Sequence, residues 1–122
     1  MKPKILVVDG DEALLEAISA ALVDAGYEVA CARDGFEALR DLKKVHPDAL
    51  IADVVLSKLD GLDLTRALRS QPETAGVPVI FISQKTQRDT VEEARRLGAK
   101  KFIAKPFDMA NLLQCLAAVL KT

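Results

Sequence analysis

The sequence predicts a doubly wound α/β domain, in which five parallel strands form one sheet and five helices cover its two faces. Short apolar runs rich in β-branched residues alternate five times with stretches of helical periodicity. These runs are almost continuously apolar, as expected for strands that are buried on both faces of a parallel sheet. With 122 residues and no linker or low-complexity stretch, the chain is long enough to enclose one core. We therefore expect a single domain over residues 1–122.

An apolar run marks each predicted strand. In chain order, these runs cover residues 5–8, 27–32, 49–56, 77–83 and 101–104. The first run, ILVV, is followed directly by Asp9. The third run is broken by one acid, Asp53, which has apolar neighbours on both sides. Acids therefore lie near the carboxyl ends of two predicted strands.

Apolar residues three and four positions apart mark each predicted helix. In chain order, the predicted helices cover residues 11–23, 35–45, 62–69, 86–97 and 108–120. Gly26 and Gly98 follow the first and fourth helices, in the place where a left-handed residue commonly ends a helix. In the second helix, we expect Phe36, Leu39 and Leu42 on the buried side.

The charge and the cysteines argue against several classes of protein. The formal net charge is −1, so no basic excess favours direct binding of nucleic acid. Cys31 and Cys115 are far apart and lack metal-ligand spacing, which indicates reduced thiols, and we expect both in the core. No apolar run reaches transmembrane length, so we expect a cytoplasmic protein without a membrane partner.

Polar residues gather at the predicted carboxyl ends of the strands, where ligands bind in open α/β sheets. They are Asp9 and Asp11 after the first strand, Asp53 in the third, Ser83 in the fourth and Lys105 after the fifth. A carboxylate with apolar neighbours needs a cation, which Lys105 can supply. Asp9 and Asp53 together suit Mg²⁺. The pattern predicts a phosphoryl-transfer site, in which Asp53 attacks phosphorus, Lys105 neutralises charge and Ser83 donates to a phosphoryl oxygen.

Four segments carry a resemblance to a known family: ILVVDGDEALL, PDALIADVVLSKLDGLDL, VPVIFISQ and GAKKFIAKPF. With them the chain resembles, along nearly its whole length, the CheY-like receiver domain of bacterial two-component response regulators, which has a flavodoxin-like fold. The resemblance implies phosphorylation of Asp53 by a histidine kinase or a phosphotransfer protein. It also implies Mg²⁺ held by Asp9, Asp53 and the backbone carbonyl of Val55, and a cis peptide bond between Lys105 and Pro106.

The resemblance further implies a switch. In the family, the hydroxyl at the Ser83 position moves toward the phosphate and an aromatic ring at the Phe102 position turns inward. These movements remodel the surface formed by the helix over 86–97, the strand over 101–104 and the helix over 108–120. We expect this surface to contact a downstream effector protein or an output domain, and a homodimer through the same surface is compatible with the resemblance.

Three positions depart from the family pattern. Gly10 lies where a second metal-binding acid is usual, Gln84 where a small residue usually follows the hydroxyl, and Ser57 where proline is common. The missing carboxylate at Gly10 predicts weakened, not abolished, binding of Mg²⁺. Asp11 has two alternative roles, as a substitute metal ligand or as the cap of the first helix, and we favour the cap.

Two other functions compete with the phosphorylated receiver. The first is a pseudo-receiver, which signals through protein interaction without phosphorylation, as Gly10 and Gln84 suggest. The second is a phosphatase of the haloacid-dehalogenase type that uses the acids of Asp9-Gly10-Asp11. An Asp-x-Asp motif alone is a weak signal, and Ala13 occupies a position where that family has threonine. We therefore expect no turnover enzyme, although slow hydrolysis of a phosphoryl group on the protein fits the receiver hypothesis.

Overall fold

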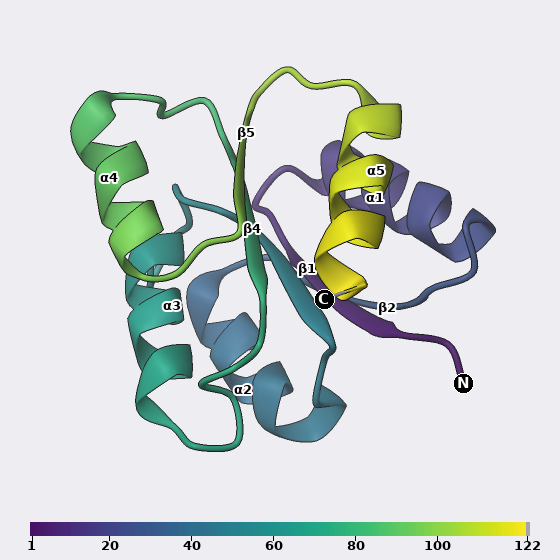
Figure 1. The fold of residues 1–122 in the computed structure, drawn as a ribbon, viewed down its shortest axis with the longest axis horizontal. Coiled ribbons are helices and arrows are strands. Elements are labelled where there is room, and N and C mark those ends of the chain that lie inside the picture. Colours follow the sequence, from purple (N-terminus) through teal and green to yellow (C-terminus); the bar gives the residue numbers. More distant parts are fainter. Residues whose placement is uncertain (122) are drawn as a thin grey trace.

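The computed structural model describes residues 1–121, in which five strands alternate with five helices (Figure 1). The strands are β1 (Lys4–Val8), β2 (Glu28–Ala32), β3 (Ala49–Asp53), β4 (Val79–Ser83) and β5 (Lys101–Ala104). The helices are α1 (Glu12–Asp24), α2 (Gly35–Val45), α3 (Gly61–Ser70), α4 (Arg88–Arg96) and α5 (Met109–Leu120). The predicted order of the elements is confirmed.

The strands form one parallel sheet in the order β2-β1-β3-β4-β5. The chain leaves β1 toward β2 on one side and continues from β3 toward β4 and β5 on the other. The direction of winding therefore reverses between β1 and β3. This reversal opens a crevice at the carboxyl ends of these two strands, which is where open α/β sheets bind ligands.

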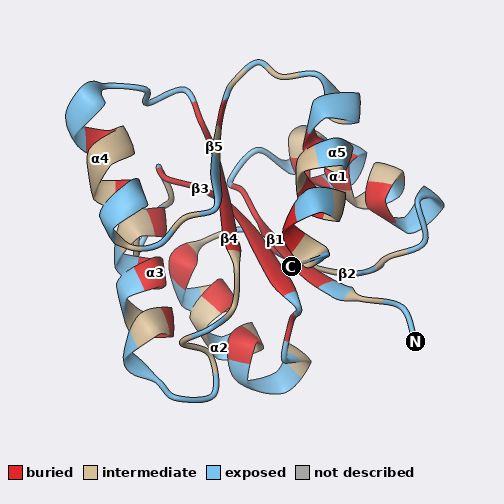
Figure 2. Ribbon diagram, viewed as in Figure 1, coloured by how far each residue is buried: buried red, intermediate tan, exposed pale blue. Residues whose placement is uncertain are grey.

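The two faces of the sheet bury separate apolar clusters. Along β1, Ile5 and Val7 join the cluster under α1 and α5, whereas Leu6 and Val8 join the cluster under α2, α3 and α4. Figure 2 accordingly shows strands that are mostly buried and helices that are exposed on their outer sides. The doubly wound, flavodoxin-like α/β class is confirmed.

The third predicted strand was too long. β3 ends at Asp53, and the apolar residues that follow it belong to a loop. Val54 is only 2% exposed, and its carbonyl accepts a hydrogen bond from Gly61 N at 2.7 Å. An apolar run shows burial but does not distinguish a strand from a buried loop, so the sequence could not locate this boundary.

Two predictions of burial were also wrong. Phe36 is 56% exposed, because the buried stripe of α2 runs through Gly35, Ala38 and Leu42, and Phe36 lies about 100° away around the helix. Cys31 is exposed because it lies on β2, an edge strand whose face is only partly covered. Cys115 is half-buried, and both cysteines are free thiols.

None of the helices between residues 1 and 121 is long and apolar enough to cross a membrane.

Candidate functional site

Three charged side chains meet at the carboxyl edge of the sheet. The Nζ atom of Lys105 lies 2.7 Å from Asp9 Oδ2 and 2.7 Å from Asp53 Oδ2. Asp9 follows β1 and Asp53 ends β3, so the two carboxylates project from neighbouring strands at the reversal point. Asp9 is 1% exposed and Asp53 is 8% exposed. Lys105 therefore supplies the cation that these buried carboxylates need.

Backbone amides orient the second oxygen of each carboxylate. Asp9 Oδ1 accepts from Asp11 N at 2.8 Å, and Asp53 Oδ1 accepts from Val55 N at 3.1 Å. A carboxylate oxygen has two lone pairs, so each oxygen can still accept a further ligand. The carboxylates are thus fixed in orientation and remain able to bind a metal ion or a phosphoryl group.

The loop after β3 is closed tightly by Gly61, the first residue of α3. A Cβ atom at Gly61 would lie 2.2 Å from the carbonyl oxygen of Asp53 and 2.9 Å from Val54 Cα. Only glycine allows the start of α3 to approach the backbone of Asp53 this closely. Asp60 caps the same helix by accepting from Asp63 N at 2.8 Å. The position of Asp53 therefore depends on α3 as well as on β3.

Lys105 remains protonated in this setting. Burial opposes the charge on its ammonium, but the hydrogen bonds that the ammonium donates to Asp53 and Asp9, together with the negative charges of these acids, outweigh burial and raise the pKa of Lys105. The backbone of Lys105 is also fixed, since Lys105 N donates to the carbonyl of Ser83 at 2.9 Å. The peptide bond between Lys105 and Pro106 is cis.

Ser83 lies next to the charged residues at the end of β4. It is fully buried, and its Oγ accepts from Lys85 N at 3.0 Å. A hollow of about 380 Å³ opens above the site. Its lining comprises Asp9, Gly10, Asp11, Leu14, Asp53, Val55, Ser83, Gln84 and Lys105. The structure thus brings most of the sequence-predicted site residues into one hollow.

The donors in this hollow fit Mg²⁺. Among residues 1–121, no group of three or more His, Cys, Asp or Glu side chains is placed to hold a metal ion. The carboxylates of Asp9 and Asp53 share the hollow with Val55, and the third acid of the lining, Asp11, caps α1. Mg²⁺ binds proteins through one or two carboxylates and keeps several of its waters. This donor set therefore suits Mg²⁺ better than a metal that needs a full set of protein ligands.

Comparison with known families identifies the type of domain. Residues 5–117 match the family model of the response regulator receiver domain. The chain belongs to this family. Receiver domains of response regulators are modules of two-component signal transduction, and the family match gives no support to a haloacid-dehalogenase-type phosphatase.

Curated relatives of this receiver domain include two mycobacterial regulators. Response regulator MprA of Mycobacterium ulcerans is 39% identical over 124 residues, which cover 99% of this chain and 51% of MprA. Transcriptional regulatory protein PrrA of Mycobacterium leprae is 35% identical over 119 residues, covering 98% of this chain and 50% of PrrA. The chain therefore spans about half the length of these relatives.

Solved structures agree in fold over the whole receiver domain. Chemotaxis protein CheY4 of Vibrio cholerae has a TM-score of 0.92 at 33% identity, covering 98% of this chain and 99% of CheY4. The receiver domain of sensor histidine kinase PA1611 from Pseudomonas aeruginosa has a TM-score of 0.90 at 30% identity, covering 100% of both chains. That structure is described with a magnesium ion coordinated in its active site cleft.

Gly10 departs from the receiver pattern without a steric reason. Its φ is not in the left-handed region, and a Cβ atom there would meet only the carbonyl oxygen of Arg33, at 3.8 Å. Asp11, the alternative metal ligand, caps α1, because its Oδ1 accepts from Leu14 N at 3.2 Å. The expected capping role of Asp11 is confirmed, and an acid at position 10 would fit this backbone.

The other two unusual positions border the site differently. Gln84 is exposed and lines the hollow above Asp53. Ser57 is exposed in the loop after β3, where its carbonyl accepts from Leu59 N at 2.8 Å and from Gly35 N at 3.3 Å. Gln84 is therefore placed to affect access to Asp53, whereas the backbone of Ser57 ties this loop to the start of α2.

Phe102 lies on β5, away from the charged residues. Its half-buried ring packs against Phe81 of β4, with ring centroids 6.2 Å apart and planes tilted by 48°. Such an aromatic pair is favourable beyond the area that it buries. Phe102 thus belongs to the edge of the cluster under α2, α3 and α4.

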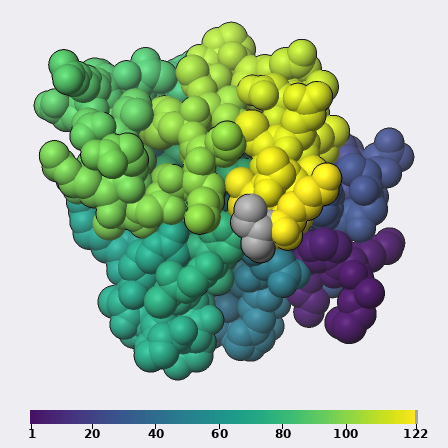
Figure 3. Space-filling view, viewed as in Figure 1, coloured from purple at the N-terminus to yellow at the C-terminus, as the bar shows by residue number. Residues whose placement is uncertain are grey.

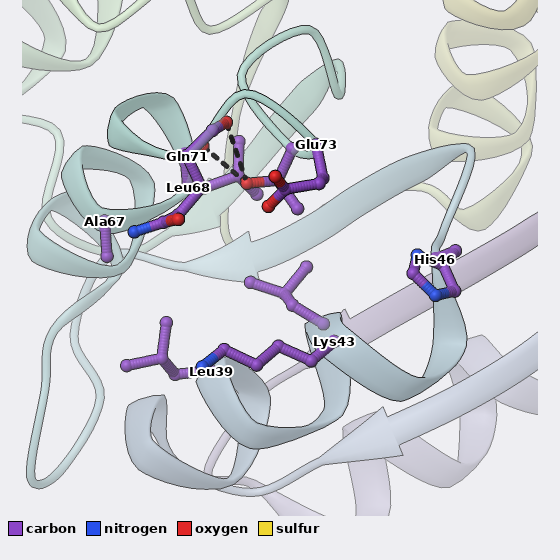
Figure 4. A pocket seen from close by; sticks show the side chains of 9 residues that line it. Leu39, Lys43, His46, Ala67, Leu68, Gln71 and Glu73 are labelled. Atoms are coloured by element: carbon purple, nitrogen blue, oxygen red, sulfur yellow. Dashed lines mark hydrogen bonds between the residues drawn. The ribbon is translucent and has the colours of Figure 1, made fainter.

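A second hollow, of about 300 Å³, lies between the carboxyl-terminal halves of α2 and α3 (Figure 4). Leu39, Lys43 and His46 line it from α2 and its cap, and Ala67 and Leu68 line it from α3. Helices of a doubly wound fold begin near the carboxyl edge of the sheet, so this hollow lies toward the opposite edge from Asp53. It is separate from the hollow above Asp53.

Proposed function

We propose that this receiver domain accepts a phosphoryl group on Asp53 from a histidine kinase or a phosphotransfer protein. The observation that carries the proposal is the contact of one ammonium, that of Lys105, with both Asp9 and Asp53 at 2.7 Å. This arrangement places a fixed cation beside a buried nucleophile. The formal charge of Asp9, Asp53 and Lys105 together is −1, which favours one bound divalent cation.

Asp53, Lys105 and Ser83 have different roles in the proposed transfer. A carboxylate oxygen of Asp53 attacks the phosphorus of a phosphohistidine, the P–N bond breaks, and the imidazole leaves as an acyl phosphate forms. Lys105 stabilises the negative charge on the phosphoryl oxygens. The hydroxyl of Ser83 donates to one of these oxygens, giving up its contact with Lys85 N.

The metal belongs to the same proposal. Asp9, Asp53 and the carbonyl of Val55 would hold Mg²⁺, which when bound would neutralise charge on the transferred group. We place its affinity below that of receivers with an acid at position 10, because Gly10 supplies no carboxylate and Asp11 is committed to capping α1.

The output surface is formed by α4, β5 and α5, whose atoms lie on one face of the molecule in Figure 3. Phe102 lies within this surface on β5, and its inward rotation would rest on apolar packing because its ring has no hydroxyl. The partner at this surface is an effector protein, an output domain or a second copy of the chain. We assign no turnover of other substrates, and a histidine kinase partner implies action in the cytoplasm.

The test is incubation with acetyl phosphate and Mg²⁺, followed by intact mass measurement. We expect one phosphate adduct on the native chain and on Asp24→Asn, a control at an exposed acid, and none on Asp53→Asn. An adduct that persists in Asp53→Asn would overturn the assignment of the site. A native chain that takes neither phosphate nor beryllofluoride would instead be a pseudo-receiver.

A further inference from the structure

Helix α4 is attached weakly along its length. Its buried residues are Thr90 and Ala94, and the remainder of the helix is largely charged. At its start, the capping residue Gln87 makes no side-chain cap hydrogen bond, and residues 84–89 are exposed. A helix with few buried apolar contacts and an uncapped end opens locally at low free-energy cost.

The carboxyl-terminal end of α4 is held by hydrogen bonds from Arg69 of α3. The guanidinium donates to Leu97 O at 2.9 Å and, more weakly, to Gly98 O at 3.4 Å, both at the end of α4. It also donates to Ala75 O at 3.0 Å and to Val77 O at 2.6 Å in the loop before β4. One planar side chain thus joins three segments through backbone carbonyls, a geometry for which arginine is suited and lysine is not.

The environment of Arg69 supports a fastening role. Burial lowers the pKa of Arg69, but an arginine remains charged in proteins, so its donors must be satisfied by acceptors. Hydrogen bonds from a charged donor to backbone carbonyls are stronger than neutral ones. One turn earlier, Arg66 contacts Glu93 of α4 at 3.1 Å and adds a second, more exposed tie between α3 and α4.

We propose that α4 is a half-anchored helix: Arg69 fixes its carboxyl-terminal end, and its amino-terminal half opens and closes about that fixed end. The free end is the one connected to the site, since Lys85 N donates to Ser83 Oγ just before α4 begins. Loss of that hydrogen bond would release the end that Arg69 does not hold. Use of this opening in signalling rests on the proposed phosphorylation of Asp53, whereas the half-anchored state itself does not.

Amide hydrogen exchange of the whole chain, followed by NMR without Mg²⁺ or beryllofluoride, tests the proposal. The informative amides are bonded in both halves: Val91 N donates to Gln87 O at 3.1 Å, and Leu97 N donates to Glu93 O at 3.1 Å. The amide of Ala99, which donates to Ala94 O at 3.1 Å, extends the comparison beyond the helix. An unanchored helix frays at both ends. We expect protection at Leu97 and Ala99 to exceed that at Val91 by about tenfold or more.

The variants separate anchoring from general stability. Arg69→Gln should lower protection at Leu97 and Ala99 by about tenfold relative to Ile51 of β3, the internal reference, and leave Val91 unchanged. Arg69→Lys should give a smaller loss of protection at Leu97 and Ala99. This variant tests the proposal if Arg69→Gln does not fold. Arg95→Gln is the control, because the guanidinium of Arg95 is bonded to Glu92 of the same helix and not to α3 or to the loop before β4 in the described part of the chain.

Two results would overturn the half-anchored state. One is equal protection of Val91 and Leu97 in the native chain. The other is unchanged protection of Leu97 and Ala99 in Arg69→Gln. Failure of beryllofluoride to bind would remove the phosphorylation proposal and leave the exchange result standing, so the two failures are distinguishable.

Discussion

The ammonium of Lys105 lies 2.7 Å from Asp53 Oδ2, although β4 lies between β3, which ends at Asp53, and β5, which precedes Lys105. Lys105 also contacts Asp9 at the same distance, so one cation balances two carboxylates that are less than a tenth exposed. Removing it would leave both acids buried without a positively charged partner, although each would keep its hydrogen bond from a backbone amide.

Lys105→Met should lower the free energy of unfolding at pH 7 by about 2–4 kcal/mol, because breaking a buried ion pair leaves an uncompensated charge. Urea unfolding measures the change. Millimolar Mg²⁺ should restore part of the loss in Lys105→Met, since it can replace the missing cation between Asp9 and Asp53. Lys101→Met, at an exposed lysine of β5, is the control and should change stability by less than about 0.5 kcal/mol. Equal stability of the two variants would contradict the proposed role of Lys105.

The stabilisation by Lys105 should also depend on pH in the alkaline range. The folded state raises the pKa of Lys105, so its stabilisation is fully present below the ordinary lysine pKa of about 10.4. Above that pH the unfolded chain releases the proton first, so the contribution declines as the pH rises through the folded pKa. The difference in unfolding free energy between the native chain and Lys105→Met should therefore be constant from about pH 8 to 10 and shrink above that. If this difference instead grows as the pH rises above about 10, the folded state does not raise the pKa of Lys105.

Gly10→Asp should tighten Mg²⁺ binding by about tenfold, because a third carboxylate is added where the backbone has room for it. Isothermal titration calorimetry gives the affinity directly. Gly10→Asn has nearly the same size without the charge and should give a smaller gain. If the affinity of Gly10→Asp equals that of the native chain, Asp11 or water already provides the missing ligand.

Gly61→Ala should destabilise the fold by about 2–3 kcal/mol, because the new Cβ atom would collide with the backbone of Asp53 and Val54. Gly76→Ala is a matched control, since nothing lies within 4 Å of a Cβ atom there and its φ is not left-handed. That control should stay within about 0.5 kcal/mol of the native chain. Denaturant unfolding midpoints of Gly61→Ala and Gly76→Ala measure the difference. Similar midpoints would mean that α3 moves away from β3 without a cost in stability.

Ala67→Leu should raise the free energy of unfolding by about 0.5–1 kcal/mol, because the apolar volume that it adds to the hollow between α2 and α3 outweighs the small loss of helix propensity from alanine to leucine. Ala17→Leu, at an exposed position of α1, is the control and should have little effect. A destabilised Ala67→Leu would show that Leu39 and Lys43 cannot move to admit the larger side chain. Because the hollow is separate from Asp53, this variant should retain phosphorylation by acetyl phosphate.

The sequence predicted the class of fold because its two periodicities are strong and repeat five times. It also predicted which residues gather near Asp53, since the carboxyl ends of parallel strands share one edge. It could not predict the close approach at Gly61 or the fastening of α4 by Arg69, because both depend on backbone atoms distant in the chain. The exposure of Phe36 and Cys31 was missed for a related reason: periodicity identifies apolar residues but not how much of a helix or edge strand its neighbours cover.

The exposure of Cys31 makes this chain convenient for fluorescence work. The protein has no tryptophan and one tyrosine, so its intrinsic emission reports little. Cys31 is exposed on edge strand β2, whereas Cys115 is half-buried and contacts Asn111 Oδ1 at 3.8 Å. Thiol reagents select the more accessible cysteine. A maleimide dye should therefore attach at Cys31 without any substitution, on the edge of the sheet opposite β5.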